Sequence, residues 1–249
     1  MFVYKIELEY DGTDFYGWQV QPGLRTVQGE MIQSISKIVQ SPFKLIGASR
    51  TDAGVHAEEQ VASLHISDKL RKSKTILKAL NGLLPEDIYV KSVREVSPEF
   101  HARFSARSKI YRYRILEGRS PLRRRYVWEL PYRLDKETLS WLSERTKGTY
   151  DFSSLSVKTP KGKGIVNVKK ALWIKKGDEW HFIIEADRFP YKMVRTLVGL
   201  QVRIACGRAP KEVLLEALVE GKRPKVFTAP PQGLSLIKVN YPRGLLREV

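Results

Sequence analysis

The octet at residues 50–57, Arg-Thr-Asp-Ala-Gly-Val-His-Ala, holds the residues of this chain best suited to chemistry. Asp52 is its single carboxylate, with the Arg50 guanidinium two residues before it and Gly54 two residues after it. Strand-like stretches at 44–48 and 61–66 flank the octet. We therefore expect Asp52 on a connection between two strands, where a rigid scaffold can aim it into a cleft. Taken alone, the octet also fits an ordinary turn aspartate, because Asp and Gly are common turn residues.

The net charge of the chain indicates a polyanionic partner. The 249 residues include 44 Lys and Arg against 27 Asp and Glu, which gives a net charge of +17 (44 − 27). Ion-pair networks would raise both kinds of charge together and do not explain this imbalance. The basic residues gather at 71–74, 103–114, 123–125 and 158–163. Nucleic acid is the expected partner, and a merely soluble basic protein is the alternative.

The most informative basic segment begins at residue 107 and reads Arg-Ser-Lys-Ile-Tyr-Arg-Tyr-Arg. As a strand, it places Lys109, Tyr111, Tyr113 and Ile115 on one face, and Ile110, Arg112 and Arg114 on the other. Aromatic rings interleaved with cations suit stacked bases and phosphates. A strand with a tyrosine core face and a solvated basic face explains the same pattern equally well. The segment 158–164 is a basic, glycine-rich loop suited to phosphates and not to base reading.

Other catalytic chemistries lack their residues. The histidines at 56, 65, 101 and 181 have no second histidine or cysteine at ligand spacing, so no metal site is expected. The absence of Walker, GxGxxG and GxSxG motifs argues against nucleotide hydrolysis, dinucleotide chemistry and the hydrolase nucleophile elbow. Cys206 is expected to pack, not to act as a nucleophile. What remains is carboxylate chemistry on a polyanion.

The cysteine content and the N-terminal sequence bear on the compartment. A single cysteine excludes a disulfide within the chain and suits a reducing environment. The N-terminal residues Met-Phe-Val-Tyr-Lys-Ile-Glu do not resemble a signal peptide, and no apolar run approaches membrane-spanning length. We therefore expect a cytoplasmic protein with no membrane partner.

Hydrophobic periodicity predicts the elements that must position Asp52. The expected strands lie at 2–10, 44–48, 57–66 and 88–93, and the expected helices lie at 27–38 and 73–83. Thr26 and Ser73 are the expected helix caps, and Pro42 and Pro85 follow the helices. The resulting order, β-α-β-β-α-β, is the ferredoxin-like arrangement.

The second half predicts a similar order of elements. The expected strands lie at 109–116, 126–130, 165–174, 180–187 and 234–239, and the expected helices at 136–146, 191–205 and 210–221. Asp135 is the expected cap of the first of these helices. We predict an α+β protein with two ferredoxin-like halves whose mixed or antiparallel sheets lie side by side around a central cleft. Residues 1–104 would carry the catalytic loop, and residues 105–249 would complete the cleft and the RNA-binding surface.

Further motifs follow in order along nearly the whole chain. They are Tyr10-Asp11-Gly12-Thr13, Gly17-Trp18-Gln19, Arg25–Glu30, the octet, Leu84–Ile88, Phe100–Phe104, Lys109–Tyr113, Asp151–Ser154, Met193–Arg195 and Thr228–Leu234. Together they resemble the bacterial tRNA pseudouridine synthases of the A type. The resemblance implies the pseudouridine synthase fold and an isomerase that converts uridine to pseudouridine at positions 38, 39 and 40 in the anticodon stem-loop of tRNA. It also implies a homodimer that binds the tRNA anticodon arm and needs no cofactor.

The resemblance assigns the catalytic role to Asp52, acting on a flipped-out uridine. The carboxylate could attack C1′ of the ribose, or it could remove a sugar proton and proceed through a glycal; the sequence leaves both routes open. The reaction changes no composition, so neither a metal nor a cofactor is required. Arg195 resembles the family arginine that pairs with this aspartate, and a nearby cation favours an ionised carboxylate in a dry pocket.

Two further residues take roles from the same resemblance. Tyr111 resembles the tyrosine that stacks on the target base, and its alternative is a core tyrosine. Arg50 resembles an arginine that assists base extrusion, and its alternative is a structural arginine that braces the loop. The chain departs from the family pattern at Ser49, Arg188, Pro190 and Thr196, none of which removes a catalytic group.

Two other classes of protein compete with this interpretation. A non-catalytic RNA-binding protein could use ferredoxin-like halves with aromatic strands. Such a protein would not need Asp52, and the chain has no RNP-like Lys-Gly-Phe-Gly-Phe stretch. A nucleoside-cleaving hydrolase would release free uracil, but glycoside hydrolysis normally uses two carboxylates and the octet has one.

Overall fold

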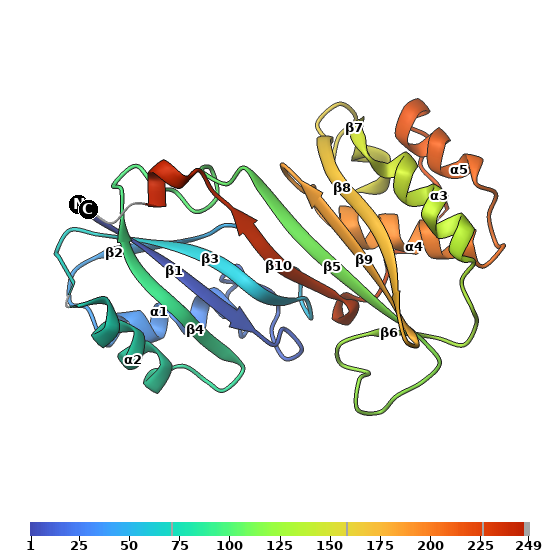
Figure 1. Ribbon diagram of the computed structural model, residues 1–249. Coiled ribbons are helices and arrows are strands. Elements are labelled where there is room, and N and C mark those ends of the chain that lie inside the picture. Colours follow the sequence, from blue (N-terminus) through green and yellow to red (C-terminus); the bar gives the residue numbers. More distant parts are fainter. Residues whose placement is uncertain (71, 158, 226, 247–249) are drawn as a thin grey trace. The chain divides into compact units, whose positions relative to one another are not determined.

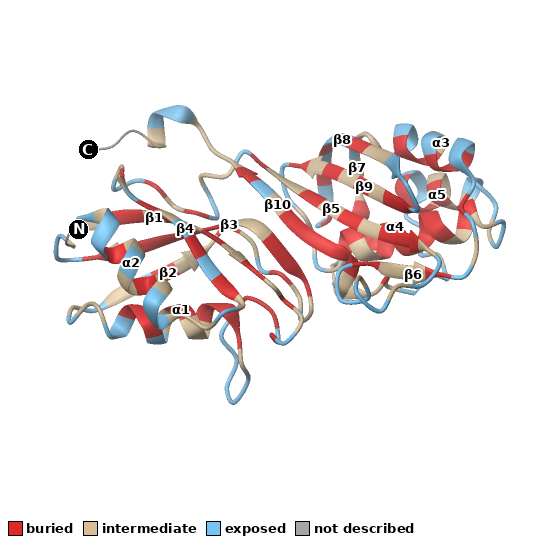
Figure 2. Ribbon diagram, turned by 60° about the horizontal axis from the view of Figure 1, so that its bottom comes forward, coloured by how far each residue is buried: buried red, intermediate tan, exposed pale blue. Residues whose placement is uncertain are grey.

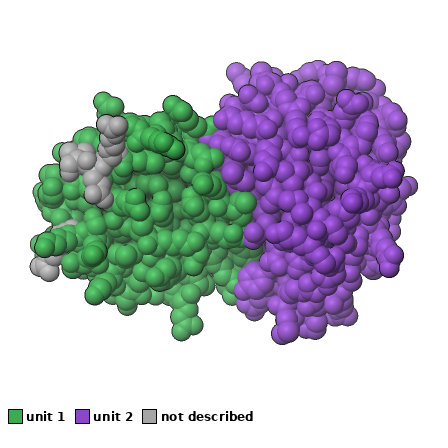
Figure 3. All heavy atoms as spheres, in the orientation of Figure 1, with its two compact units in different colours: residues 1–107, 236–249 green, residues 108–235 purple. Residues whose placement is uncertain are grey.

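The computed structural model describes residues 1–70, 72–157, 159–225 and 227–246. The chain folds into two compact units, coloured separately in Figure 3: residues 1–107 with 236–249, and residues 108–235. Residues 236–249, which the sequence predicts as part of the second half, group with the first unit. The division into functional halves at residues 104 and 105, and the cleft expected between them, stay predictions. Arg71 and Lys158, which belong to the basic segments, lie outside the described residues.

The first unit has the ferredoxin-like order that the sequence predicted. Its elements are β1 (Phe2–Tyr10), α1 (Val27–Ser36), β2 (Phe43–Gly47), β3 (His56–Ile66), α2 (Ser73–Leu83), β4 (Ile88–Val96) and most of β10 (Leu234–Asn240). The strands β4, β1, β3 and β2 are neighbours in that order, and each neighbouring pair is antiparallel. β10 also lies next to β3. The fold class predicted for this half is therefore confirmed.

Alternating burial explains how the first unit is held together. β1 buries Tyr4, Ile6 and Leu8 on one face, as its sequence pattern predicts. Figure 1 shows α1 and α2 on the same side of these strands. The N-terminus of α1 is capped as expected, because the Thr26 side chain accepts a hydrogen bond from the Gly29 N–H. The expected Ser73 cap is wrong: the capping position is residue 72, and no side chain bonds the first turn of α2.

The second unit repeats the same arrangement with additions. Its elements are β5 (Ser108–Glu117), β6 (Trp128–Leu130), α3 (Lys136–Thr146), β7 (Gly148–Asp151), β8 (Ile165–Lys176), β9 (Glu179–Ala186), α4 (Met193–Ala205) and α5 (Glu212–Leu215). The antiparallel strands follow the order β5-β9-β8-β7, and β6 pairs parallel to β5. Thus β5, β9 and β8 take the first, third and second places of a ferredoxin-like half. β7 was not predicted, and the helix expected over 210–221 divides into α5 and a π-helical segment, Glu216–Glu220.

The core of the second unit lies between its strands and α4. Figure 2 shows α4 buried over most of its length, and Leu197 and Val198 are fully covered. β5 buries Tyr111, Tyr113 and Ile115, so the face predicted from the alternation is confirmed. Within the described residues, no helix has the length and apolar character needed to cross a membrane.

Candidate active site

Asp52 lies where the sequence predicted, on the connection between β2 and β3. The backbone turns tightly here, because the Val55 N–H donates to the Asp52 carbonyl oxygen at 3.2 Å. Gly54 has φ +74°, a left-handed conformation that glycine adopts without strain. Asp52 is half-buried and Arg50 is exposed.

The segment 12–18 holds this loop through its backbone. The Trp18 N–H donates to the Thr51 carbonyl oxygen at 3.1 Å, and the Gly54 N–H donates to the Phe15 carbonyl oxygen at 3.2 Å. These two bonds lie on either side of Asp52 in the sequence. The main chain that carries the carboxylate is therefore fixed at both of its ends, which is how a rigid scaffold orients a side chain.

Two glycines allow the segment 12–18 to approach this closely. A Cβ atom built on Gly17, where φ is +90°, would lie 2.6 Å from the Thr51 carbonyl oxygen and 3.1 Å from the Asp52 carbonyl carbon. A Cβ atom on Gly12 would lie 2.0 Å from the Val55 carbonyl oxygen. Any larger residue at either position would push the Asp52 loop away, so both glycines are part of its support.

Side chains hold the start of the same loop. The Tyr10 hydroxyl and Thr51 Oγ1 are 2.7 Å apart, within hydrogen-bond distance. Gln60 is fully buried, and its amide bonds both backbone groups of Ser49: Nε2 donates to the Ser49 oxygen (2.9 Å), and Oε1 accepts from the Ser49 N–H (3.3 Å). Ser49 has no positive φ, so the departure from glycine at this position introduces no backbone strain.

An ion pair anchors the supporting segment. Arg25 donates to both carboxylate oxygens of Asp87, at 2.7 and 2.9 Å. Its guanidinium carbon lies 4.2 Å from the centre of the Phe15 ring, and its carbonyl oxygen accepts from the Tyr16 N–H. This bidentate geometry is the strong form of an arginine–carboxylate contact. The segment 12–18 is thus tied to the residue just before β4.

In the second unit, Arg195 lies in the first turn of α4 and is half-buried. Its Nε donates to the Ala229 carbonyl oxygen at 2.8 Å, and the Ala229 N–H donates back to the Arg195 carbonyl oxygen at 3.1 Å. The first bond restrains the guanidinium, and the second joins the backbones of the two residues. α4 begins after Lys192, whose φ of 60° is unusual for a residue with a side chain. The helix entry is therefore unusual at the place where Arg188 and Pro190 depart from the family pattern.

Tyr111 and Tyr113 lie on the buried face of β5. The exposed fraction of Tyr111 is 5%, and its ring packs edge-on against Phe189 with 4.9 Å between centroids. The Tyr113 hydroxyl donates to the Pro230 carbonyl oxygen at 2.7 Å. Burial raises the pKa of Tyr113 well above its usual value, against the opposing charge of Arg195, so the hydroxyl stays protonated and donates. The segment 228–234 thus bonds Tyr113 and Arg195 through neighbouring carbonyl groups.

Two further observations concern polar groups. Thr196 is buried, and its Oγ1 has no hydrogen-bond partner among the residues that the structure describes. Over the same residues, no group of three or more His, Cys, Asp or Glu side chains could hold a metal ion.

Comparison with known proteins identifies the family. Residues 8–105 and 143–242 match the family model described as tRNA pseudouridine synthase, and the chain belongs to this family. It is an isomerase that converts uridine to pseudouridine in tRNA. The resemblance inferred from the ordered motifs is confirmed.

Several relatives carry a more specific name. The chain is 39% identical to tRNA pseudouridine synthase A of Aquifex aeolicus, over 95% of this chain and 98% of the relative. It is 39% identical to the protein of that name from Thermoanaerobacter sp., with the same coverage. The corresponding protein of Chlorobaculum tepidum is 40% identical, over 95% and 97% of the two chains.

Among solved structures, a chain of a Cbf5-Nop10-Gar1 complex matches 82% of this chain and 54% of its own length, with 13% identity. The TM-score of this match is 0.35.

Sequence reasoning missed the residues that support the site. It quoted Gly12 and Gly17 only as parts of matching motifs, and it assigned no role to Gln60 or Ala229. Both glycines lie beside turn-forming residues, which could have indicated a structural role. The backbone that they contact, at residues 51–56, is far from them in the sequence.

Proposed function

We propose that Asp52 is the catalytic carboxylate and that the enzyme acts on uridines 38, 39 and 40 in the anticodon stem-loop of tRNA. The observation that carries the proposal is the support of the Asp52 loop: backbone bonds at both ends, and two glycines whose hydrogen atoms face it. A carboxylate that must be aimed at a reacting atom needs its backbone held in this way.

The reaction itself needs one well-placed carboxylate. The bond from N1 of uracil to C1′ of ribose breaks, the base turns, and C5 bonds to C1′. C5 then loses its proton and N1 gains one, so the composition is unchanged. Asp52 either bonds C1′ covalently or removes a sugar proton, and in both routes it must be ionised at the start. No step requires an oxidant, a reductant or a second substrate.

We propose Arg195 as the residue that keeps the Asp52 carboxylate ionised during turnover. The bond from its Nε to the Ala229 carbonyl oxygen supports this role, because it orients the guanidinium. The Arg195→Lys variant keeps the charge but has no Nε–H to donate to Ala229, so we expect lower turnover from it.

Two substrate contacts complete the proposal. Tyr111 would stack on the everted uracil, and Arg50 would assist its extrusion from the exposed side of the loop. Unstacking a base costs roughly a few kcal/mol, which such contacts offset. We also propose that the enzyme works in the cytoplasm as a homodimer in which one tRNA spans both subunits.

The Asp52→Asn variant tests the central assignment. Tritium release from tRNA labelled at C5 of uridine measures turnover, and mapping of pseudouridine locates the product. We expect Asp52→Asn to bind tRNA but to release no detectable tritium. We expect the wild-type enzyme to form pseudouridine at positions 38, 39 and 40. The exposed Glu86 supplies a matched control, because Glu86→Gln removes one carboxylate of the same unit. Normal turnover by Asp52→Asn would contradict the assignment, and free uracil would indicate a hydrolase.

A further inference from the structure

The loop that joins β5 to β6, residues 118–127, concentrates positive charge. It contains four arginines and no carboxylate. Arg119, Arg124 and Arg125 are exposed, whereas Arg123 is partly covered. The large apolar side chains exposed in the loop are Leu122, at 91%, and Tyr126, at 40%. Residues 123–125 are one of the basic segments that indicate a nucleic-acid partner, but no individual residue of the loop has yet been given a contact.

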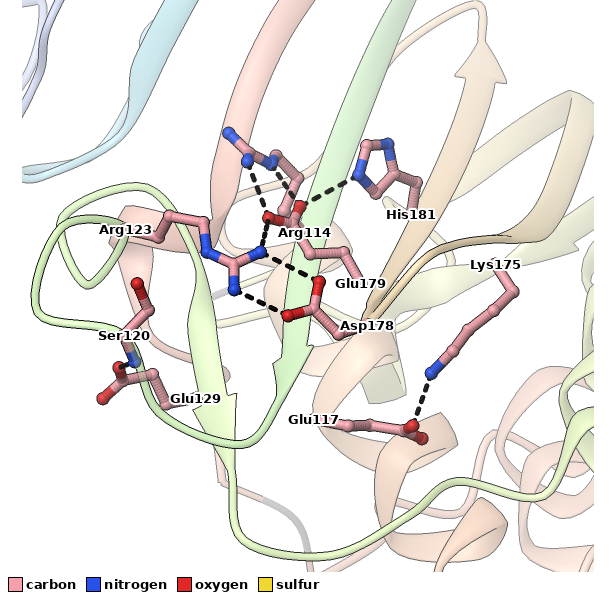
Figure 4. A network of polar contacts seen from close by, with 9 residues as sticks. All are labelled: Arg114, Glu117, Ser120, Arg123, Glu129, Lys175, Asp178, Glu179 and His181. Carbon is pink, nitrogen blue, oxygen red and sulfur yellow. Dashed lines mark hydrogen bonds and ion pairs between the residues drawn. The ribbon is translucent and has the colours of Figure 1, made fainter.

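The backbone of the 118–127 loop is folded into turns. The N–H groups of Arg123 and Arg124 both donate to the Ser120 carbonyl oxygen, at 3.1 and 3.0 Å. The Ser120 N–H donates to Glu129 Oε1 at 2.5 Å, a bond drawn in Figure 4. The Tyr126 N–H donates to the Arg123 carbonyl oxygen at 2.8 Å. The arginines therefore project from a defined backbone, which lowers the entropy lost when they bind a ligand.

Arg123 ties the loop to the hairpin between β8 and β9. Figure 4 shows its guanidinium directed at Asp178 and Glu179. Nη1 and Nη2 donate to the two carboxylate oxygens of Asp178, at 2.9 and 2.6 Å, and Nη1 also donates to Glu179 Oε1 at 3.1 Å. Arg114 donates to both oxygens of Glu179, at 2.9 and 3.0 Å, and His181 lies 3.1 Å from the same carboxylate.

The carboxylates of Asp178 and Glu179 balance the charge of Arg123. Two guanidinium groups, of Arg114 and Arg123, face two carboxylates, of Asp178 and Glu179. Burial alone would raise the pKa of Glu179, but the bonds from Arg114 and His181 outweigh it and lower that pKa, so the carboxylate is ionised at neutral pH. An arginine already paired in this way has little charge left to offer a phosphate.

Arg119 and Arg124 differ from Arg123 in their pairing. Among the described residues, neither side chain has a carboxylate partner, and both are exposed. We propose that the 118–127 loop is a phosphate-binding surface for tRNA, in which Arg119 and Arg124 bind backbone phosphates. Arg123 is the positioning residue that holds them there through Asp178 and Glu179. The proposal rests on the tRNA substrate and is independent of the role of Asp52.

The chemistry of the loop favours RNA over a protein partner. A guanidinium matches a phosphate with two parallel hydrogen bonds, and several of them on one loop repel one another unless an anion lies between them. A stable protein interface buries about 800 Å² on each side and has an apolar centre. Leu122 and Tyr126 alone are too small an apolar surface for that.

The salt dependence of tRNA binding tests the two phosphate contacts. Each neutralised phosphate contributes roughly 0.7–0.9 to the slope of log K against log salt concentration. The Arg119→Gln/Arg124→Gln variant should therefore bind tRNA more weakly, with a slope smaller in magnitude by about 1.4–1.8. The control is Lys136→Gln/Lys170→Gln, which removes two exposed charges from α3 and β8 and should leave the slope and the turnover unchanged. Equal slopes for wild type and the double arginine variant, or an equal fall in the control, overturn the proposal.

Limited trypsin digestion tests the positioning role of Arg123. Trypsin cuts after arginine, and it cuts faster where the backbone is freer to unfold locally. We expect Arg123→Gln to be cut after Arg124 and Arg125 faster than wild type, and we expect tRNA to protect the wild-type loop. Unchanged cleavage in Arg123→Gln contradicts the anchor, and a loop that tRNA leaves unprotected contradicts the binding surface. If Arg123→Gln differs from the wild type in oligomeric state when no RNA is present, the loop is a protein contact instead.

These outcomes are separable from those of the proposed function. Affinity and protection are measured without turnover, so they do not depend on which residue is catalytic. Failure of the slope test removes the loop from the binding surface and leaves the Asp52 assignment intact. Retained turnover in Asp52→Asn removes that assignment and leaves the loop intact.

Discussion

Replacing Gly17 by alanine tests whether the segment 12–18 aims Asp52. The added Cβ would lie 2.6 Å from the Thr51 carbonyl oxygen, whereas ordinary contacts begin at 3.4 Å, so one side must move by about 0.8 Å (3.4 − 2.6). The Gly17 side resists movement because Trp18, its neighbour, is buried and packs against Gly47. The Asp52 loop, whose residues 52–54 are partly or fully exposed, therefore moves. A misplacement of about 1 Å can cost roughly 100-fold in rate, and we expect a loss of that order in turnover.

Gly23 provides the matched control for this experiment. Its φ is +71°, so alanine is strained there by about 1–2 kcal/mol, as it is at Gly17. A Cβ on Gly23 meets nothing within 4 Å. The difference between Gly17→Ala and Gly23→Ala thus isolates the steric push on the Asp52 loop. The assays are tritium release and the free energy of unfolding in denaturant. Overpacking should cost Gly17→Ala a further 1–3 kcal/mol or so. If both variants have the same turnover and the same stability, the reasoning is refuted.

Three further predictions concern the supporting structure. Thr26→Ala removes the cap of α1 and should lower the free energy of unfolding by about 1 kcal/mol, with Thr26→Ser restoring most of it in a denaturant titration. The lowered pKa of Glu179 means that the unfolded chain takes up its proton first on acidification, so the network's stability is complete above pH 4.5 and is lost as pH falls through the folded pKa. Glu179→Gln should flatten that part of the acid-unfolding curve. Asp151 accepts hydrogen bonds from the Ser153 N–H and hydroxyl and from the Gly162 N–H, so Asp151→Asn should lower stability by about 1–3 kcal/mol and speed trypsin cleavage near Gly162.

Most of the fold could be predicted because its elements bury side chains with a regular period. β1, β3 and α2 were placed within a residue or two by alternation or by helical spacing. β7 could not be, because its four residues, Gly148–Asp151, are too few to show alternation, and their pairing with β8 is a tertiary contact. The cap of α2 was wrong because the helix begins at Ser73 itself, which places the hydroxyl inside the first turn.

The sequence predicted the candidate catalytic residue but not the residues that support it. Asp52 was identified because its neighbours in the chain form a specific motif between two strands. Gly12 and Gly17 were not recognised as its support, because the importance of a missing Cβ depends on which backbone lies against it. The reciprocal bonds between Arg195 and Ala229 likewise join residues separated by a long stretch of sequence. Such contacts follow from the fold and leave no local pattern.

The structure shows that some of the clustered basic residues are paired with carboxylates, which the sequence alone does not reveal. Two basic loops of the second unit are held by acidic side chains that lie outside the loops themselves. Asp178 and Glu179 hold the 118–127 loop through Arg123, and Asp151 holds the turn near Gly162 through its N–H group. Arg123 fixes its loop in this way, and because its charge is balanced by carboxylates it releases few counterions from a phosphate. The salt dependence of tRNA binding should therefore reflect fewer contacts than the clustered arginines and lysines suggest, because the paired cations shape the surface and the unpaired ones bind.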